Sequence, residues 1–233
     1  MKKLSAFAIL MTILISCTSK QGNMTVKGNI TGLKKGTVYL QKVKDTALVI
    51  VDSVVIDGNS EFILVDDIIS PEVYYLTLDK KSNEHITFFG DKGEIIIDSK
   101  LEKLVYSAKI KGSKNQTLLD QHNKMIKKFN DKQLDLIKAN FEAQRDKDLE
   151  MIENISKKEK NLLKRRYLYT VNFAVTHGKH EIAPYLALTD LYNVNVSLLD
   201  TINNSLSKKV KKSKYGLELQ KFIDTIKKSE AIK

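Results

Sequence analysis

The spacing of apolar residues changes once along the chain. Between Met24 and about Ile110, apolar and polar residues alternate in short runs separated by turn signals, which is typical of strands with one buried face. Asp57-Gly58 is typical of a tight hairpin, so we expect it to join the third strand to the fourth. The eight predicted strands are 24–30, 37–43, 48–55, 61–65, 73–78, 85–89, 94–97 and 105–110. They indicate an antiparallel β-sandwich or a partly open barrel.

From Lys114 onward the apolar residues follow the period of a helix. Several of them fall on or beside one line of a helical wheel, which predicts a long helix with one buried stripe. These residues are Leu118, Leu119, Met125, Ile126, Phe129, Leu136 and Ile137. The stripe fades over residues 142–150, a charged stretch that we expect to project into solvent. Ser156-Lys157-Lys158-Glu159 then matches a capping box and predicts the start of another helix.

This second helix is predicted to end at Gly178, and shorter helices follow it. Pro184 suits the first turn of a short helix that carries Tyr185 and Leu186, and a last helix is predicted to start near Ser213. The predicted buried residues are Leu163, Tyr167, Val171, Ala174, Leu199, Ile202, Leu206, Val210, Tyr215, Leu219, Phe222, Ile223 and Ile226. The predicted fold class is therefore α+β, with an N-terminal antiparallel β-sandwich followed by an all-helical C-terminal region.

The N-terminus has the pattern of an export signal. Lys2 and Lys3 precede the apolar run 4–15, which is shorter than the roughly twenty residues that span a bilayer. Leu14-Ile15-Ser16-Cys17 resembles the lipobox of bacterial lipoproteins, in which the cysteine receives diacylglycerol and then an N-acyl chain. The alternative is an incidental cysteine in an ordinary signal peptide. We predict lipid attachment, including palmitate, at Cys17, and no other cofactor.

The residues that follow Cys17 bear on the location of the protein. Residues 18–23 form a short polar tether. Thr18 stands where an aspartate would favour retention in the inner membrane, and the tether lacks the acidic cluster of surface-exported lipoproteins. We therefore expect a cell-envelope protein at the outer membrane, anchored by its N-terminal lipid and facing the periplasm.

The net charge of +11 is not spread evenly along the chain. Residues 17–112 contain 13 basic and 13 acidic residues, whereas residues 113–233 contain 24 basic and 15 acidic residues. The change in charge coincides with the change in apolar spacing. We therefore expect a signal peptide (1–16), a lipidated tether (17–23), a β-sandwich domain (24–112) and a helical region (113–233).

A dense basic run lies in the helical region and consists of Lys208, Lys209, Lys211, Lys212 and Lys214. Such runs contact nucleic acid, anionic lipid headgroups or lipopolysaccharide phosphates, or they form a solvated helix face. An exported protein does not meet chromosomal DNA, so we expect no nucleic-acid partner. Contact with an anionic surface and a solvated face both stay open.

Few residues suggest catalysis or metal binding. His177, His180 and Glu181 are ligand types, but their spacing across a turn fixes no coordination geometry, so a polar turn between helices is the simpler interpretation. Neither a nucleophile elbow nor a phosphate-binding loop occurs in the sequence. Cys17 is the only cysteine, which excludes a Cys-x-x-Cys redox pair. We therefore predict that the protein is not an enzyme and has no metal site.

The predicted sandwich carries further motifs of turn and apolar residues. They are Val26-Lys27-Gly28-Asn29-Ile30, Gly36-Thr37-Val38-Tyr39-Leu40, residues 52–58 with Phe62, residues 71–78, residues 88–97, and Lys111-Gly112-Ser113 with Asn115. In these motifs the region resembles the domain of unknown function that many Bacteroidetes envelope lipoproteins carry at their N-terminus. In those proteins a thioredoxin-like domain, of the thiol peroxidase or thiol-disulfide reductase type, commonly follows.

The resemblance extends into the helical region. Its helices, ending in Ser213-Lys214-Tyr215-Gly216, look like the linker helices that precede the redox domain in that family. The chain stops at Lys233, where that domain would begin, so we expect no thiol chemistry. We expect a non-enzymatic docking module that binds a periplasmic or outer-membrane protein through its β face or its projecting helices. The alternative is an accessory scaffold for a separate periplasmic thioredoxin-like enzyme.

Overall fold

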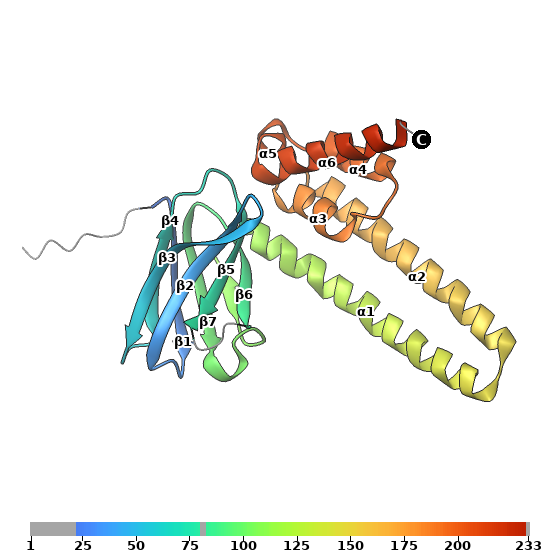
Figure 1. Cartoon of the computed structure of the whole chain (residues 1–233), viewed down its shortest axis with the longest axis horizontal. Helices are drawn as coiled ribbons and strands as arrows, with labels where there is room; N and C mark the ends of the chain where they lie inside the picture. The colour runs from blue at the N-terminus through green and yellow to red at the C-terminus, as the bar shows by residue number, and fades with distance from the viewer. Residues whose placement is uncertain (1–21, 80–82, 232–233) are drawn as a thin grey trace, which may run out of the picture.

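The computed structural model describes residues 22–79 and 83–231. These residues form a β-sandwich followed by helices, two of which extend far beyond the rest of the molecule (Figure 1). The predicted α+β class, with eight N-terminal strands and an all-helical C-terminal region, is confirmed. The predicted signal peptide and the lipid attachment at Cys17 lie outside the described residues.

The strands form two four-stranded sheets, with the orders β4-β1-β7-β8 and β3-β2-β5-β6. Their bounds are β1 Met24–Thr31, β2 Lys35–Lys44, β3 Ala47–Asp57, β4 Glu61–Asp66, β5 Glu72–Leu78, β6 His85–Gly90, β7 Gly93–Lys100 and β8 Lys109–Lys111. One pair departs from the predicted antiparallel pattern, because β1 pairs with β7 in parallel. Parallel neighbours need a long crossover, and here the whole second sheet lies between β1 and β7 in the chain.

The predicted hairpin at Asp57-Gly58 is wrong. β3 and β4 belong to different sheets, and β4 pairs with β1. Alternation explains the pairing, because Phe62 and Leu64 of β4 are buried and face the core from the sheet opposite β3. Gly58 has φ +92, and its N–H donates to the carbonyl of Lys34 (2.8 Å), so it makes a corner between the sheets.

The last predicted strand, 105–110, is mostly a turn. A short 3-10 helix (Leu101–Lys103) precedes it, and β8 begins only at Lys109. The Ser107 hydroxyl accepts from the N–H of Lys100 (2.9 Å) and donates to the carbonyl of Lys103 (2.8 Å). These local bonds replace strand pairing and leave Tyr106 almost fully exposed.

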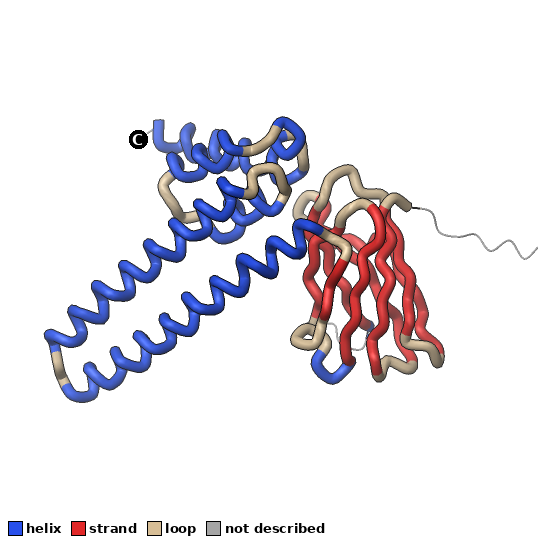
Figure 2. Tube along the Cα trace, turned by 180° about the vertical axis from the view of Figure 1, so that it is seen from behind, coloured by secondary structure: helices blue, strands red, loops and turns tan. Residues whose placement is uncertain are grey.

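The helices are α1 Lys114–Asp146, α2 Leu149–Thr176, α3 Ile182–Asp190, α4 Val196–Ser205, α5 Lys208–Lys211 and α6 Lys214–Ala231. The predicted capping box at Ser156 is wrong, because α2 already starts at Leu149 and runs through Ser156 without a break. Asp148 is the N-cap, and its carboxylate accepts from the N–H of Met151 (2.9 Å). Helices α3 and α4 pack against the end of α2, α6 packs on α3 and α4, and α5 packs on α6. We call α3 to α6 the helical base (Figure 2).

Three apolar clusters hold the described residues together. The first lies between the two sheets. The second joins the helical base to α2 and contains Leu199, Ile202, Leu206 and Val210, as predicted. The third joins Val73 and Phe89 of the second sheet to helices, so β5 is buried on both faces. None of the described helices has the length and apolarity needed to cross a membrane.

Gly178 does not end α2 in the manner predicted. The helix ends at Thr176, and Gly178 lies where a Cβ atom would meet the Ser205 carbonyl oxygen at 2.4 Å. A close approach between two segments therefore requires this glycine, rather than a left-handed helix end. At Gly112, both the left-handed backbone and a close approach require glycine. Its φ is +100, and a Cβ atom there would lie 2.0 Å from the Glu94 carbonyl oxygen. Gly112 directly precedes Ser113, the N-cap of α1.

Candidate docking surface

The most prominent surface of the molecule is the outer part of the α1–α2 pair, residues 124–166, which we call the arm. Figures 1 and 2 show it running away from both the sandwich and the helical base. The structure describes every residue of the arm, and only Ala143 and Ile155 are buried. Helices of ordinary globular proteins bury a much larger share of their side chains. Nearly all side chains of the arm therefore contact solvent.

The turn at the tip of the arm is tightly hydrogen-bonded. Lys147 takes a left-handed conformation, φ 57, and ends α1. The N–H of Asp148 then donates to the carbonyl of Ala143 (2.9 Å), and the Asp148 side chain caps α2. The charged stretch 142–150 is thus the reversal between two long helices, and its exposure agrees with the prediction.

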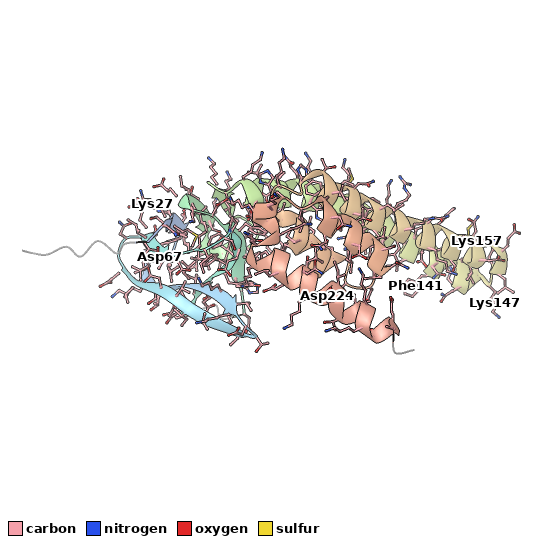
Figure 3. All side chains as sticks on the ribbon, turned by 90° about the horizontal axis from the view of Figure 1, so that it is seen from above. Lys27, Asp67, Phe141, Lys147, Lys157 and Asp224 are labelled. Carbon is pink, nitrogen blue, oxygen red and sulfur yellow. The ribbon has the colours of Figure 1, made fainter. Side chains whose placement is uncertain are left out.

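One face of the arm is apolar and exposed. Leu134, Ile137 and Phe141 of α1 are 64%, 38% and 69% exposed, and their spacing of three and four places them on one face. We call these three residues the apolar stripe. Figure 3 shows Phe141 on the side of the arm near its tip, short of Lys147. Leu163 of α2, which was predicted to be buried, is 47% exposed and adds to this surface.

Shallow clefts run along both sides of the arm. A cleft of about 250 Å³ on one side is lined by Phe129, Gln133 and Leu163, next to the apolar stripe. Two clefts of about 330 and 380 Å³ lie on the other side and share Lys132 and Arg165. The clefts have apolar floors and charged rims on which basic residues outnumber acidic ones. Such clefts fit an occupant that is apolar at its centre and mainly acidic at its edge.

The arm is basic along its length. Residues 124–166 contain 13 basic and 8 acidic side chains. Few of them are paired, and the pairs of Glu153 with Lys157 and of Arg145 with Asp146 are exposed contacts within single helices. The remaining positive charge is available to steer and orient an acidic partner.

The outer face of the second sheet offers a smaller alternative surface. A cleft of about 360 Å³ there is lined by Tyr39, Leu48, Ile50 and Tyr75 among others. Leu48 and Ile50 are more than half exposed. This is the β face that the sequence also suggested, but it is flanked by the rest of the sheet and does not project from the molecule.

Aromatic residues fasten the helices to the sandwich. Tyr215 of α6 accepts a hydrogen bond from the buried N–H of Val73 (2.9 Å), and its ring meets those of Phe89 and Tyr185 edge-on or tilted. Burial raises the pKa of Tyr185 to about 12 and also raises the pKa of Tyr215. The Gln116 side chain of α1 accepts from the N–H of Phe89 (2.8 Å). The start of α1 and the start of α6 are therefore fixed to the second sheet.

A chain of ion pairs reinforces this joint. The Lys214 amine contacts the Glu72 carboxylate (2.6 Å) and donates to the carbonyl of Val43 (2.7 Å). Glu72 also faces Lys42, which pairs with Asp66. Tyr74 donates to Asp66 (2.6 Å), and burial, together with this bond, raises the pKa of Tyr74. Lys214 is thus half-buried in a structural contact, unlike the other lysines of the basic run.

The other four lysines of that run, Lys208, Lys209, Lys211 and Lys212, are exposed on and beside α5. The structure adds a fifth that the sequence did not suggest. Ser207, the N-cap of α5, donates its N–H to the carbonyl of Gly178 (2.9 Å), which places exposed Lys179 beside the same short helix. We call Lys179 and these four lysines the basic end.

The histidines have structural surroundings. His177 caps α2 and packs on Phe173 with ring centroids 4.4 Å apart, and partial burial lowers its pKa. Glu181 accepts from the Asn115 amide (3.1 Å) rather than facing His177. His122 is fully buried between α1 and α2, where Thr170 bonds its ring (3.1 Å) and burial lowers its pKa.

A polar cleft of about 370 Å³ lies where the sandwich meets α1 and α3. His85, Asp120, Asn123 and Asp190 are among its lining residues. Burial raises the pKa of Asp120, and a hydrogen bond from Gln116 opposes this effect. Across residues 22–79 and 83–231, no three His, Cys, Asp or Glu side chains lie close enough together to hold a metal ion.

One comparison with known proteins gives a match. Residues 24–119 match the family model described as a domain of unknown function (DUF4369). The match spans the sandwich and the first residues of α1, which confirms the domain that the turn motifs resembled. No curated protein and no solved structure matches the chain.

Proposed function

We propose that this protein is a non-enzymatic docking module of the bacterial cell envelope, held at the periplasmic face of the outer membrane by a lipid on Cys17, with the arm as its contact surface. The observation that carries the proposal is the apolar stripe. Single exposed apolar side chains are ordinary on a protein surface, whereas contiguous exposed ones are typical of interaction sites. The stripe lies on the part of the molecule that reaches furthest from the sandwich (Figure 1).

The chemistry of the arm specifies the kind of partner. Apolar residues in the centre of an interface supply binding energy, and charges at its rim supply orientation and specificity. With 13 basic and 8 acidic residues, the arm fits a protein whose contact surface has an apolar centre and an acidic rim. A helix of that pattern would lie in the cleft beside Phe129 and Gln133 as a third helix.

The contact surface is tested by site-specific crosslinking in intact cells. A photoreactive residue placed at Phe141 should give a discrete crosslinked protein, identified by mass spectrometry. Leu217 is the matched control, because it is a large apolar residue, 59% exposed, on another long helix. Crosslinks of equal yield at both positions, or none at Phe141, would contradict docking by the arm. Recovery of a Cys-x-x-Cys protein would favour the accessory redox role.

The lipid anchor is tested separately. Cells grown with a clickable palmitate analogue should label the wild-type chain and not Cys17→Ser. The lipobox Leu14-Ile15-Ser16-Cys17 supports this expectation. Equal labelling of the two chains would remove the anchor from the proposal and leave the arm as a separate question.

A further inference from the structure

The basic end is an isolated concentration of positive charge. Its five lysines, Lys179, Lys208, Lys209, Lys211 and Lys212, are all exposed. No acidic residue occurs between positions 201 and 217. None of these lysines forms an ion pair with another of the described residues, whereas Lys214 next to them is paired with Glu72. Free lysines clustered without neutralising carboxylates favour contact with an anionic surface.

The basic end lies at the same end of the molecule as the start of β1. The Asn23 amide donates to the Ile68 carbonyl (2.9 Å) and accepts from the Ile68 N–H (2.8 Å). Two residues further on, the Ser70 hydroxyl accepts from the N–H of Lys214, which directly follows the basic run (3.3 Å). Figure 1 shows α5 and the start of β1 along the upper side of the molecule, with the arm running down and away from that side.

The relative orientation of these parts is fixed. Lys214 bonds to both Glu72 and Val43 of the second sheet, and Tyr215 bonds to Val73. The short helix α5 directly precedes this joint, so it cannot turn independently of the sandwich. The start of β1 and the five lysines therefore belong to one rigid surface.

We propose that the basic end rests on the anionic phospholipid headgroups of the membrane that holds the lipid anchor. This inference rests on the proposed lipidation of Cys17, because the six residues 18–23 reach only about 20 Å when extended. Such a tether holds the start of β1 close to the membrane, and with it the side of the molecule that carries the basic end. Lysines of the basic end that come within one Debye length of the headgroups, about 10 Å at 0.1 M salt, are attracted to anionic lipid.

The contact orients the molecule. With α5 and the start of β1 on the headgroups, the arm points away from the membrane (Figure 1). The apolar stripe is then held where it meets a partner and not the lipid of its own membrane. The membrane contact and the docking surface thus occupy opposite parts of the chain.

Vesicle flotation tests the contact with the purified mature chain, residues 17–233, carrying Cys17→Ser, so that neither the apolar leader nor the proposed lipid is present. The probes are vesicles of phosphatidylcholine alone and vesicles containing 30% phosphatidylglycerol. One variant replaces Lys208, Lys209, Lys211 and Lys212 with Glu. A matched variant makes the same change at four exposed lysines of the arm, Lys128, Lys132, Lys158 and Lys160. Circular dichroism checks that both variants fold.

The unchanged chain and the arm variant should bind the anionic vesicles alike, and none of the chains should bind phosphatidylcholine alone. The α5 variant should bind at least tenfold more weakly, and millimolar inorganic phosphate should not compete, because the contact needs a charged surface. Equal losses in the two variants would show a general charge effect and overturn the proposal. A loss confined to the arm variant would also overturn it.

The orientation has its own readout. The Cys17→Ser chain has no other cysteine, so a single fluorophore can be placed at Lys212→Cys or Phe141→Cys. Headgroup-attached quenchers in the anionic vesicles should quench the label at position 212 at least threefold more than the label at 141. Stronger quenching at 141 would mean that the arm lies on the membrane. Failure of the palmitate labelling would count against the anchor alone, because vesicle binding is measured without it.

Discussion

The sandwich and the arm differ in how many of their apolar residues they bury. The sandwich places residues of both sheets in one shared cluster, with Val26, Leu40, Phe88 and Ile95 completely buried. The arm leaves its apolar stripe in solvent and buries only Ala143 and Ile155 of its own residues, all of them described. Burial of apolar area drives folding, so the sandwich holds the fold, whereas the outer arm adds little to it. Residues that folding does not use are available for binding.

The two regions also differ in their charge balance. Residues 17–112 carry balanced charge, whereas the arm has an excess of basic side chains. Balanced charge suits a compact body, and unbalanced charge costs stability through self-repulsion. The arm carries this repulsion although it makes few tertiary contacts. Such a surface suits binding to an acidic partner, which would neutralise the charge.

The largest expected effect comes from placing a charge at a buried position or at an exposed position of the same helix. Leu118 and Leu134 both lie in α1, but Leu118 is 2% exposed in the joint with the sandwich and Leu134 is 64% exposed on the arm. Leu118→Asp should lower the free energy of unfolding by about 3–5 kcal/mol, because the carboxylate loses its water without gaining a partner. Leu134→Asp should change it by less than about 0.5 kcal/mol. Urea denaturation measures both, and similar midpoints would refute the contrast.

A medium effect is expected at the joint between the two regions. Tyr215→Phe leaves the buried N–H of Val73 without its acceptor, which should cost about 1–3 kcal/mol of unfolding free energy. Tyr106→Phe is the control, since Tyr106 is 95% exposed in a turn of the sandwich. Thermal and chemical denaturation should separate the two variants. Equal stability of Tyr215→Phe and wild type would mean that the hydrogen bond does not hold the joint.

The smallest effect is a pH dependence that belongs to the helices. Burial lowers the pKa of His122 below its ordinary value of 6.5, so the unfolded chain binds this proton more tightly. The stability contribution is complete above pH 6.5 and is lost as the pH falls from there toward the lower folded-state pKa. One such proton changes stability by at most about 1.4 kcal/mol per pH unit.

His122→Gln should therefore flatten the fall in stability between pH 7 and pH 5, whatever it does to stability at pH 7. His85→Gln, at an exposed position of the sandwich, should leave the slope unchanged. Denaturation at a series of pH values measures both slopes. A slope that survives His122→Gln would point to His177, whose pKa is also lowered by burial.

Local patterns predicted the elements well where one face of each element meets a core. Alternation located the strands, because β1 and β7 each bury every second residue over part of their length. The helical stripe located α1, and Leu199 and Leu219 are buried as expected. Pairing was harder to predict, since Asp57-Gly58 suits a hairpin and a corner between sheets equally well. Ser156 misled in a similar way, because a capping box inside a long helix looks like a helix start.

The sequence by itself determined the class of fold, the number of strands, the change from sheet to helix near residue 112 and the uneven charge, because these depend on periodicity and composition. Tertiary structure alone decided which lysines are free. Lys208 and Lys214 are alike in a basic run, yet Glu72, far away in sequence, pairs with only the second. It also decided that Leu163 is exposed although its helix is amphipathic, because no further element covers that face of the arm. Exposure depends on neighbours that are distant in the chain, and no local pattern records them.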